Sequence, residues 1–285
     1  MGKFTALHEI QKLDPQRDHE RIVYLSACFD FPFDTTRALE FALFRTFAVP
    51  SISAILDGTG EFRHRAQKRY DDTDILISEL VEYGYRSDRG SRAIRRMNQL
   101  HGRFSIPNCD FLYVLSTFIF EPIRWNDRYG WRPMCEAERL SYFYFWREVG
   151  QRMHIQEIPA DYDSFDRFNR EFEQERFLFA ETNQRVGSAT REVFVSWFPR
   201  PFAPLVRSAV YAMLDEPLRE AFGFPQPSRL MAWLIPNALR LRSRLIRWMP
   251  ARRNPRLRTD MKRPNYPSGY QIETIGPVDA GNSGS

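Results

Sequence analysis

The sequence has 285 residues, of which 43% are hydrophobic, 27% charged and 15% aromatic, and this balance indicates an ordinary soluble globular protein with a sizeable core. Its three cysteines, Cys28, Cys109 and Cys135, are widely spaced and form no C-x-x-C pair, which argues against a disulfide framework or a zinc cluster. The formal net charge is +5, and the excess of basic residues lies within residues 229–263 rather than over the whole surface.

Helical patterns dominate the chain, whereas strand signals are weak, and the hairpin-like pair Asp57-Gly58 follows a helical pattern. Gly84 is expected to close the second predicted helix, Pro107 to follow the third, and Pro122 to stop the fourth. In chain order, we expect helices over residues 34–46, 63–83, 87–104, 108–120, 136–153, 163–180, 188–197, 204–214 and 228–248.

These elements predict one all-α domain, because the chain shows neither an internal repeat nor a linker in its middle. Residues 1–13 are interpreted as an N-terminal lead and residues 14–249 as the helical domain. Residues 250–285 are interpreted as an extended tail rich in Pro and Arg, with residues 281–285 disordered. Pro236 lies inside the last predicted helix, where a proline can bend the helix axis.

His101 has the most informative setting of the histidines, within the segment SRAIRRMNQLHGRF. On a helix, Ile94, Met97 and His101 share one face at positions i, i+3 and i+7, while the opposite face is rich in Arg. A neutral imidazole on an apolar face offers the lone pair that a proximal haem ligand needs. The same pattern also fits an ordinary core histidine that is hydrogen-bonded to the backbone, and it is the commoner outcome.

A second polar group is carried by the segment KRYDDT, in which Arg69, Asp72 and Thr73 share a helix face. A cation, a carboxylate and a hydroxyl presented together can fix an oxygen-derived ligand, move a proton or hold a haem propionate. The alternative is a solvated helix face with an Arg–Asp ion pair at i, i+3.

The order of KRYDDT followed by His101-Gly102 resembles the catalytic domain shared by latex-clearing rubber oxygenases and the membrane-bound farnesyl-chain oxygenase of mycophenolic acid biosynthesis. The resemblance runs from about Asp14 to Pro277, and the flanking segments are more similar to the farnesyl-oxygenase branch. These segments are ALFRTFAVPSISAIL (42–56), TGEF before the KRYDDT motif, FEPIRW (120–125), RYGWR (128–132), FWREVG (145–150) and GYQIETIGP (269–277).

The resemblance implies an all-helical, globin-like bundle that binds one haem b, with its iron held by a histidine on a core helix. His101 matches that histidine, and Arg69 and Thr73 match an Arg and a Thr on the helix that faces the other side of the haem. Met97 and Arg69 are expected to contact the cofactor. Rubber oxygenases have a Lys directly before that Thr, whereas this chain has Asp72, which argues against direct rubber cleavage and leaves Asp72 as a candidate base or proton relay.

The reaction that the resemblance implies is a dioxygen-dependent oxidative cleavage of a carbon–carbon double bond in an isoprenoid or lipid-like chain, with carbonyl products. The rings of residues 111–120 and 142–146 would line an apolar channel, a role that the sequence does not separate from core packing. Two alternatives stay open. One is a haem protein of another class, such as a sensor, a carrier or a peroxidase-like enzyme, and the other is a membrane-associated helical binding protein without a cofactor.

The basic segment 229–263 offers a peripheral membrane contact, with Trp233, Leu241 and Trp248 among the residues that would face lipid. The alternative is a surface helix whose Arg stems cover the core. No nucleic-acid partner is expected, since the segment contains no recognition module. Neither an apolar run of about 18 residues nor a secretory signal is visible, so we expect a protein that is cytoplasmic or peripherally associated with a membrane.

Overall fold

The computed structural model describes residues 3–277, and this part of the chain is all-helical, as predicted. Within it no strand occurs, and Arg263 and Tyr266 form an isolated bridge. The α-helices are α1 (Thr5–Ile10), α2 (His19–Leu25), α3 (Pro32–Phe47), α4 (Pro50–Gly58), α5 (Glu61–His64), α6 (Ala66–Tyr83), α7 (Asp88–His101), α8 (Asn108–Tyr129), α9 (Glu136–Arg152), α10 (Tyr162–Arg176), α11 (Glu181–Ser196), α12 (Ala203–Met213), α13 (Glu216–Phe222) and α14 (Arg229–Trp248). A π-helix covers Ser26–Asp30, and 3₁₀-helices cover Arg200–Phe202 and Ile272–Thr274.

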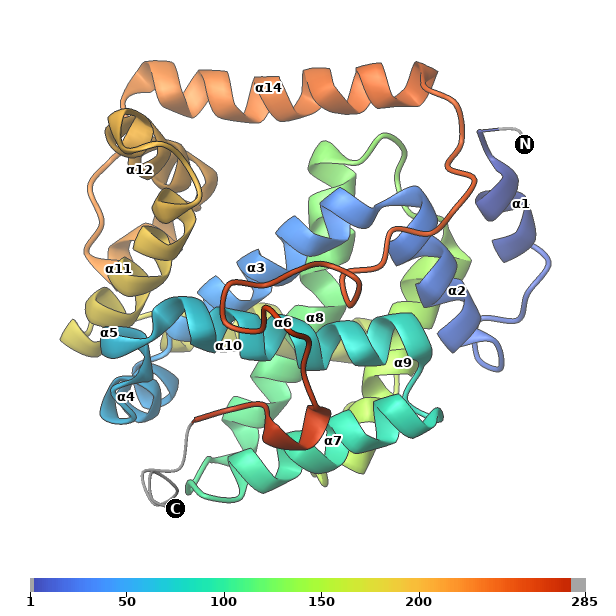
Figure 1. The fold of residues 1–285 in the computed structure, drawn as a ribbon, viewed down its shortest axis with the longest axis horizontal. Coiled ribbons are helices and arrows are strands. Elements are labelled where there is room, and N and C mark those ends of the chain that lie inside the picture. The colour runs from blue at the N-terminus through green and yellow to red at the C-terminus, as the bar shows by residue number, and fades with distance from the viewer. Residues whose placement is uncertain (1–2, 278–285) are drawn as a thin grey trace.

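Three helix pairs build the body of the molecule: α3 packs along α8, α2 along α9, and α6 along α7. Figure 1 shows α6 and α7 running roughly parallel across the lower half of the view, while α14 spans the opposite edge. The main core joins α2, α6, α7, α8 and α9 through buried rings such as Phe118, Tyr142 and Trp146. A second cluster, which includes Phe44, Phe47 and Phe222, joins α3 to α5, α11 and α13.

Helix α8 is longer than predicted, because the chain does not stop at Pro122 but continues to Tyr129. A proline inside a helix removes one backbone hydrogen bond, which usually ends or kinks the helix. Here the residues on both sides, Phe120 and Ile123, are buried in the main core, and the Asn126 side chain donates a 2.8 Å hydrogen bond to the Pro122 carbonyl. Tertiary packing therefore outweighs the local stop signal.

The predicted helix over residues 63–83 is two helices, α5 and α6, because Arg65 leaves the helical region with φ −143° and ψ 42°. Helix α7 begins after Ser87, whose side chain accepts from the Gly90 amide, and it ends at His101 rather than near residue 104. Helices α3, α9, α12 and α14 agree with the prediction within two residues at each end, and α14 continues through Pro236. Helices α1, α2, α4 and α13 were not predicted.

Residues 250–277, called the strap below, contain no long helix but lie across α6 and α7 (Figure 1). Ile272 and Ile275 of the strap are buried in the main core, and Arg96 of α7 donates a 2.6 Å hydrogen bond to the Ile275 carbonyl. The disorder predicted for residues 281–285 lies outside the described residues.

Candidate functional site

A cavity of about 250 Å³ lies among α4, α6, α7, α8 and the strap. Its volume is close to the lower end of the range of roughly 300–1,000 Å³ that small-molecule sites occupy. The lining is mostly aliphatic and aromatic, and it includes Phe104, which is 43% exposed. Every candidate residue named from the sequence lies in the wall of this cavity, namely Arg69, Asp72, Thr73, Met97 and His101.

His101 is the last residue of α7, and its ring packs edge-on against Phe111 with the ring centroids 5.5 Å apart. Its Nδ1 atom is buried and has no hydrogen-bond partner in the described part of the chain. Burial, followed by the nearby positive charge of Arg69, lowers the pKa of the imidazole to about 4. The ring is therefore neutral at pH 7, and it is not the ordinary core histidine held by a backbone hydrogen bond.

Arg69 and Thr73 are held together on α6, because the Arg69 guanidinium donates to the Thr73 hydroxyl. The Thr73 hydroxyl in turn donates a 3.1 Å hydrogen bond to the Arg69 carbonyl. Burial lowers the pKa of Arg69, and within residues 3–277 no salt bridge joins Arg69 to a carboxylate. The solvated Arg–Asp pair that the sequence left as an alternative is thus not formed.

Asp72 is paired with Lys68 instead, whose Nζ lies 2.9 and 3.0 Å from the two carboxylate oxygens. The hydroxyl of Tyr266, in the strap, also donates to Asp72. Lys68 continues the chain of contacts by donating a 2.5 Å hydrogen bond to the Gly276 carbonyl. Through these contacts Asp72, in the cavity wall, is linked to the strap. Its role as a base or proton relay stays a prediction.

Met97 is buried on the same face of α7 as His101 and lines the cavity.

The rings that were predicted to line an apolar channel fall into two groups. Phe111 and Phe118 line the cavity together with Trp146 of α9, whereas Phe120, Tyr142, Phe143 and Phe145 do not and are packed in the core.

The sequence reasoning missed several groups in or behind this wall. Asp110, near the start of α8, lines the cavity and has a buried Oδ2 without a hydrogen-bond partner in the described residues. The i, i+4 spacing could have identified Lys68 as a partner of Asp72. Tyr266 lies 194 residues from Asp72 in the sequence, so no local pattern indicated that contact. Gly276 has φ +119°, a backbone conformation that residues with a side chain rarely adopt, so glycine is favoured where the strap approaches α7.

The fold and the site thus define an all-helical protein with a mostly apolar cavity, whose wall includes a neutral imidazole and a few polar side chains. A model of the family described as "ER-bound oxygenase mpaB/B'/Rubber oxygenase, catalytic domain" matches residues 38–248. The chain belongs to this oxygenase family, which confirms the resemblance stated from the sequence.

Three relatives show how far the similarity extends. The chain is 30% identical to the ER-bound oxygenase mpaB of Penicillium roqueforti (strain FM164) over 214 residues, which are 69% of this chain and 72% of that protein. It is 27% identical to the ER-bound oxygenase mpaB' of Penicillium brevicompactum over 78% of this chain, a match that spans 57% of the relative. The identity to mpaB of Penicillium brevicompactum is 35% over 45% of this chain and 34% of that protein.

Within residues 3–277, no helix by itself combines the length and apolarity that a bilayer crossing requires. The bent pair α3 and α4, which meet at 95°, meets both criteria when its two helices are taken together.

Proposed function

We propose that the protein is a haem b-dependent oxygenase that cleaves a carbon–carbon double bond in an isoprenoid or lipid-like substrate. The observation that carries the proposal is the neutral imidazole of His101, with its unpartnered Nδ1, in the wall of an apolar cavity that also contains Arg69 and Thr73. Membership of an oxygenase family supports the same reaction type.

The residues present fit a haem group. A neutral, half-buried imidazole supplies the lone pair that the iron requires, and the apolar lining suits a porphyrin face and an apolar chain. Met97, on the same face of α7 as His101, would contact the porphyrin, and a globin-like arrangement around the cofactor is part of this proposal. When bound, the haem would supply the binding and activation of dioxygen.

Arg69 and Thr73 would provide the polar side of the pocket. A guanidinium has five N–H donors, and the one that Arg69 gives to Thr73 leaves others for an oxygen-derived ligand or a haem propionate. Asp72, held by Lys68 and Tyr266, would keep α6 in place and can accept or deliver a proton.

The overall reaction balances without an external reductant. One dioxygen molecule adds its two oxygen atoms to the two carbons of the double bond, and the bond between those carbons breaks to give two carbonyl groups. The pocket therefore needs to bind dioxygen and an unsaturated chain together and to exclude water, which its mostly apolar lining favours.

The test begins with absorption spectra of the protein after reconstitution with haem b, in oxidised and dithionite-reduced forms, with and without carbon monoxide. We expect a Soret band at one haem per chain that is lost in His101→Ala and retained in His64→Ala, since His64 is an exposed histidine on α5. Oxygen uptake is then measured with a farnesyl-chain substrate, and carbonyl products are expected in step with the oxygen consumed.

Three results would count against the proposal. Haem binding without oxygen uptake on any isoprenoid would favour a sensor, carrier or peroxidase-like protein. A Soret band that persists in His101→Ala would show that His101 is not the iron ligand. No haem in the wild type would favour a helical binding protein without a cofactor.

We propose that the protein acts at a membrane surface, with which it is peripherally associated. The substrate class is apolar, the relatives that match the chain are named ER-bound, and the basic segment 229–263 supplies positive charge for such a contact.

A further inference from the structure

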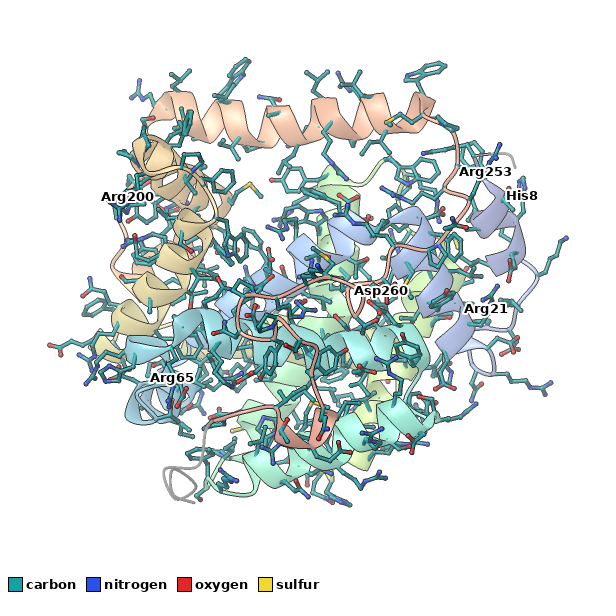
Figure 2. The ribbon with its side chains drawn as sticks, in the orientation of Figure 1. His8, Arg21, Arg65, Arg200, Arg253 and Asp260 are labelled. Atoms are coloured by element: carbon teal, nitrogen blue, oxygen red, sulfur yellow. The ribbon has the colours of Figure 1, made fainter. Side chains whose placement is uncertain are left out.

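Helix α14 exposes large apolar side chains along one face, which is unusual for a helix docked on a globular body. Leu230, Leu234, Leu241, Leu245 and Trp248 follow the helical repeat at i, i+4, i+11, i+15 and i+18, so they form one stripe. Their exposed fractions are 63, 39, 57, 60 and 88%, respectively. Figure 2 shows side chains standing away from the body along the whole outer side of this helix.

Arginines border the stripe. Arg229, Arg240, Arg244 and Arg247 are exposed, and α14 contains no acidic residue to pair with them. On the helical wheel Arg229, Arg240 and Arg247 lie together at one edge of the stripe, where their stems can lie along it while the guanidinium groups extend outward.

The inner face of α14 fixes this orientation. Arg242 forms a 2.8 Å salt bridge with Asp34 of α3, and its guanidinium lies 3.9 Å from the centre of the Phe33 ring. Ser243 is buried, and Ile246 packs against the main core. The helix is therefore docked through one face, and it does not turn its apolar stripe inward within the described structure.

We propose that the outward face of α14 lies flat in the interface of a bilayer that contains anionic lipids, with the apolar stripe among the acyl chains and the arginines at the phosphates. The outward face of α14 would then make the peripheral membrane contact proposed above, and the inference rests on that membrane association. An amphipathic helix with aromatic and Leu residues on one side and Arg beside them binds in this way. Trp233, which is 64% exposed, and Trp248 stand at opposite ends of the helix, and Trp side chains favour the bilayer interface.

Charge argues for lipid over a second copy of the chain. Two α14 helices packed stripe to stripe would bring their arginine rows together with no acidic residue on either helix to compensate. Anionic headgroups supply the opposite charge along the whole row, and acyl chains cover the stripe.

The experiment is co-sedimentation of the full chain with vesicles of phosphatidylcholine, with and without phosphatidylserine. We expect binding that is strengthened by phosphatidylserine, and a loss of about tenfold or more in the double variant Leu241→Ser/Leu245→Ser, since burying these side chains drives insertion. The matched control is Leu178→Ser/Phe179→Ser, whose residues are 59 and 58% exposed but lie between α10 and α11, and it should bind as the wild type does.

A second double variant, Arg240→Gln/Arg244→Gln, keeps the stripe and should lose most of the gain from phosphatidylserine, so the inference can be tested even if Leu241→Ser/Leu245→Ser folds poorly. Three results would each overturn it: no vesicle binding by the wild type, equal binding by Leu241→Ser/Leu245→Ser and the wild type, or self-association of the wild type that Leu241→Ser/Leu245→Ser abolishes. Neither vesicle binding nor its loss depends on haem, so this inference and the proposed oxygenase function fail separately.

Discussion

The wall of the cavity and the outer face of α14 depart from the usual distribution of residues in opposite directions. The wall holds a half-buried guanidinium and a half-buried imidazole, those of Arg69 and His101, whereas α14 exposes Leu241 and Trp248. A desolvated polar atom without a hydrogen-bond partner, such as the Nδ1 of His101, lowers stability, and contiguous exposed apolar residues lower solubility. Departures from local consistency are expected at functional sites, and Figure 1 shows α14 along one edge of the view, apart from α6 and α7, which carry Arg69 and His101.

The largest effect on stability is expected at the cavity wall, in the variant Asp72→Leu. This change leaves Lys68 without its carboxylate partner at a position where its side chain is only 15% exposed, and a loss of about 3–5 kcal/mol in the free energy of unfolding is expected. Urea unfolding measures it. The control is Asp88→Leu in the ion pair with Arg92, where Asp88 is 80% exposed and a loss below about 1 kcal/mol is expected. Equal losses in the two variants would show that Asp72 is not a buried partner.

A pH-dependent loss of stability is expected from His101 in the haem-free protein. Its pKa falls from 6.5 to about 4 on folding, so between these values the unfolded chain binds a proton that the folded chain does not. The free energy of unfolding therefore rises with pH through this window, and the His101 contribution is complete above pH 6.5 and lost by pH 4, by about 3 kcal/mol at most. Urea unfolding at several pH values compares the wild type with His101→Leu, whose curve should be flatter by this amount. Parallel curves would contradict the assignment.

A smaller effect is expected from Tyr266→Phe, which removes the strap hydroxyl that donates to Asp72. The lost hydrogen bond should cost about 1 kcal/mol in the free energy of unfolding and weaken haem binding, because Asp72 lies in the cavity wall beside Thr73 and Arg69. Tyr270→Phe removes a comparable 2.6 Å hydrogen bond to Glu79, away from the cavity. It should match the first variant in stability but leave haem affinity unchanged, as measured by titration with haem b. If both variants lowered haem affinity equally, the link through Asp72 would be wrong.

The smallest effect on stability is expected on α14. Leu241→Ser changes a side chain that is 57% exposed, so the free energy of unfolding should change by less than about 0.5 kcal/mol even though vesicle binding falls. Thermal unfolding in the absence of lipid checks this value. A large loss would mean that Leu241 packs against the protein, and the contrast between the two regions would then disappear.

Local patterns predicted most of the long helices and the composition of the site. The apolar periodicity of α7 placed Met97 and His101 on one face, and the i, i+4 spacing placed Arg69 beside Thr73, and the structure has both arrangements. Helix α4 was not recognised, although Pro50 stands at its first position, where proline is favoured, and Val49 before it is extended.

The remaining features depend on contacts between distant parts of the chain. Pro122 is tolerated because both sides of α8 are buried there, which the local sequence does not express. The partners of Asp72 in the strap and the orphaned Nδ1 of His101 are likewise set by tertiary packing. The apolar stripe of α14 was visible as a periodic pattern, but only the docking of Arg242 on Asp34 shows which face is outward.

The position of the strap near the end of the described chain determines when the cavity is completed during synthesis. Lys68 and the Gly276 carbonyl that it binds are separated by 208 residues, so a ribosome completes α6 and α7 long before it synthesises the segment that crosses them. Until then the cavity lacks the part of its wall that Gly276 and Pro277 provide. Any ligand enclosed by this pocket is therefore enclosed after most of the chain has left the ribosome, and a nascent chain halted before the strap would present an unfinished pocket.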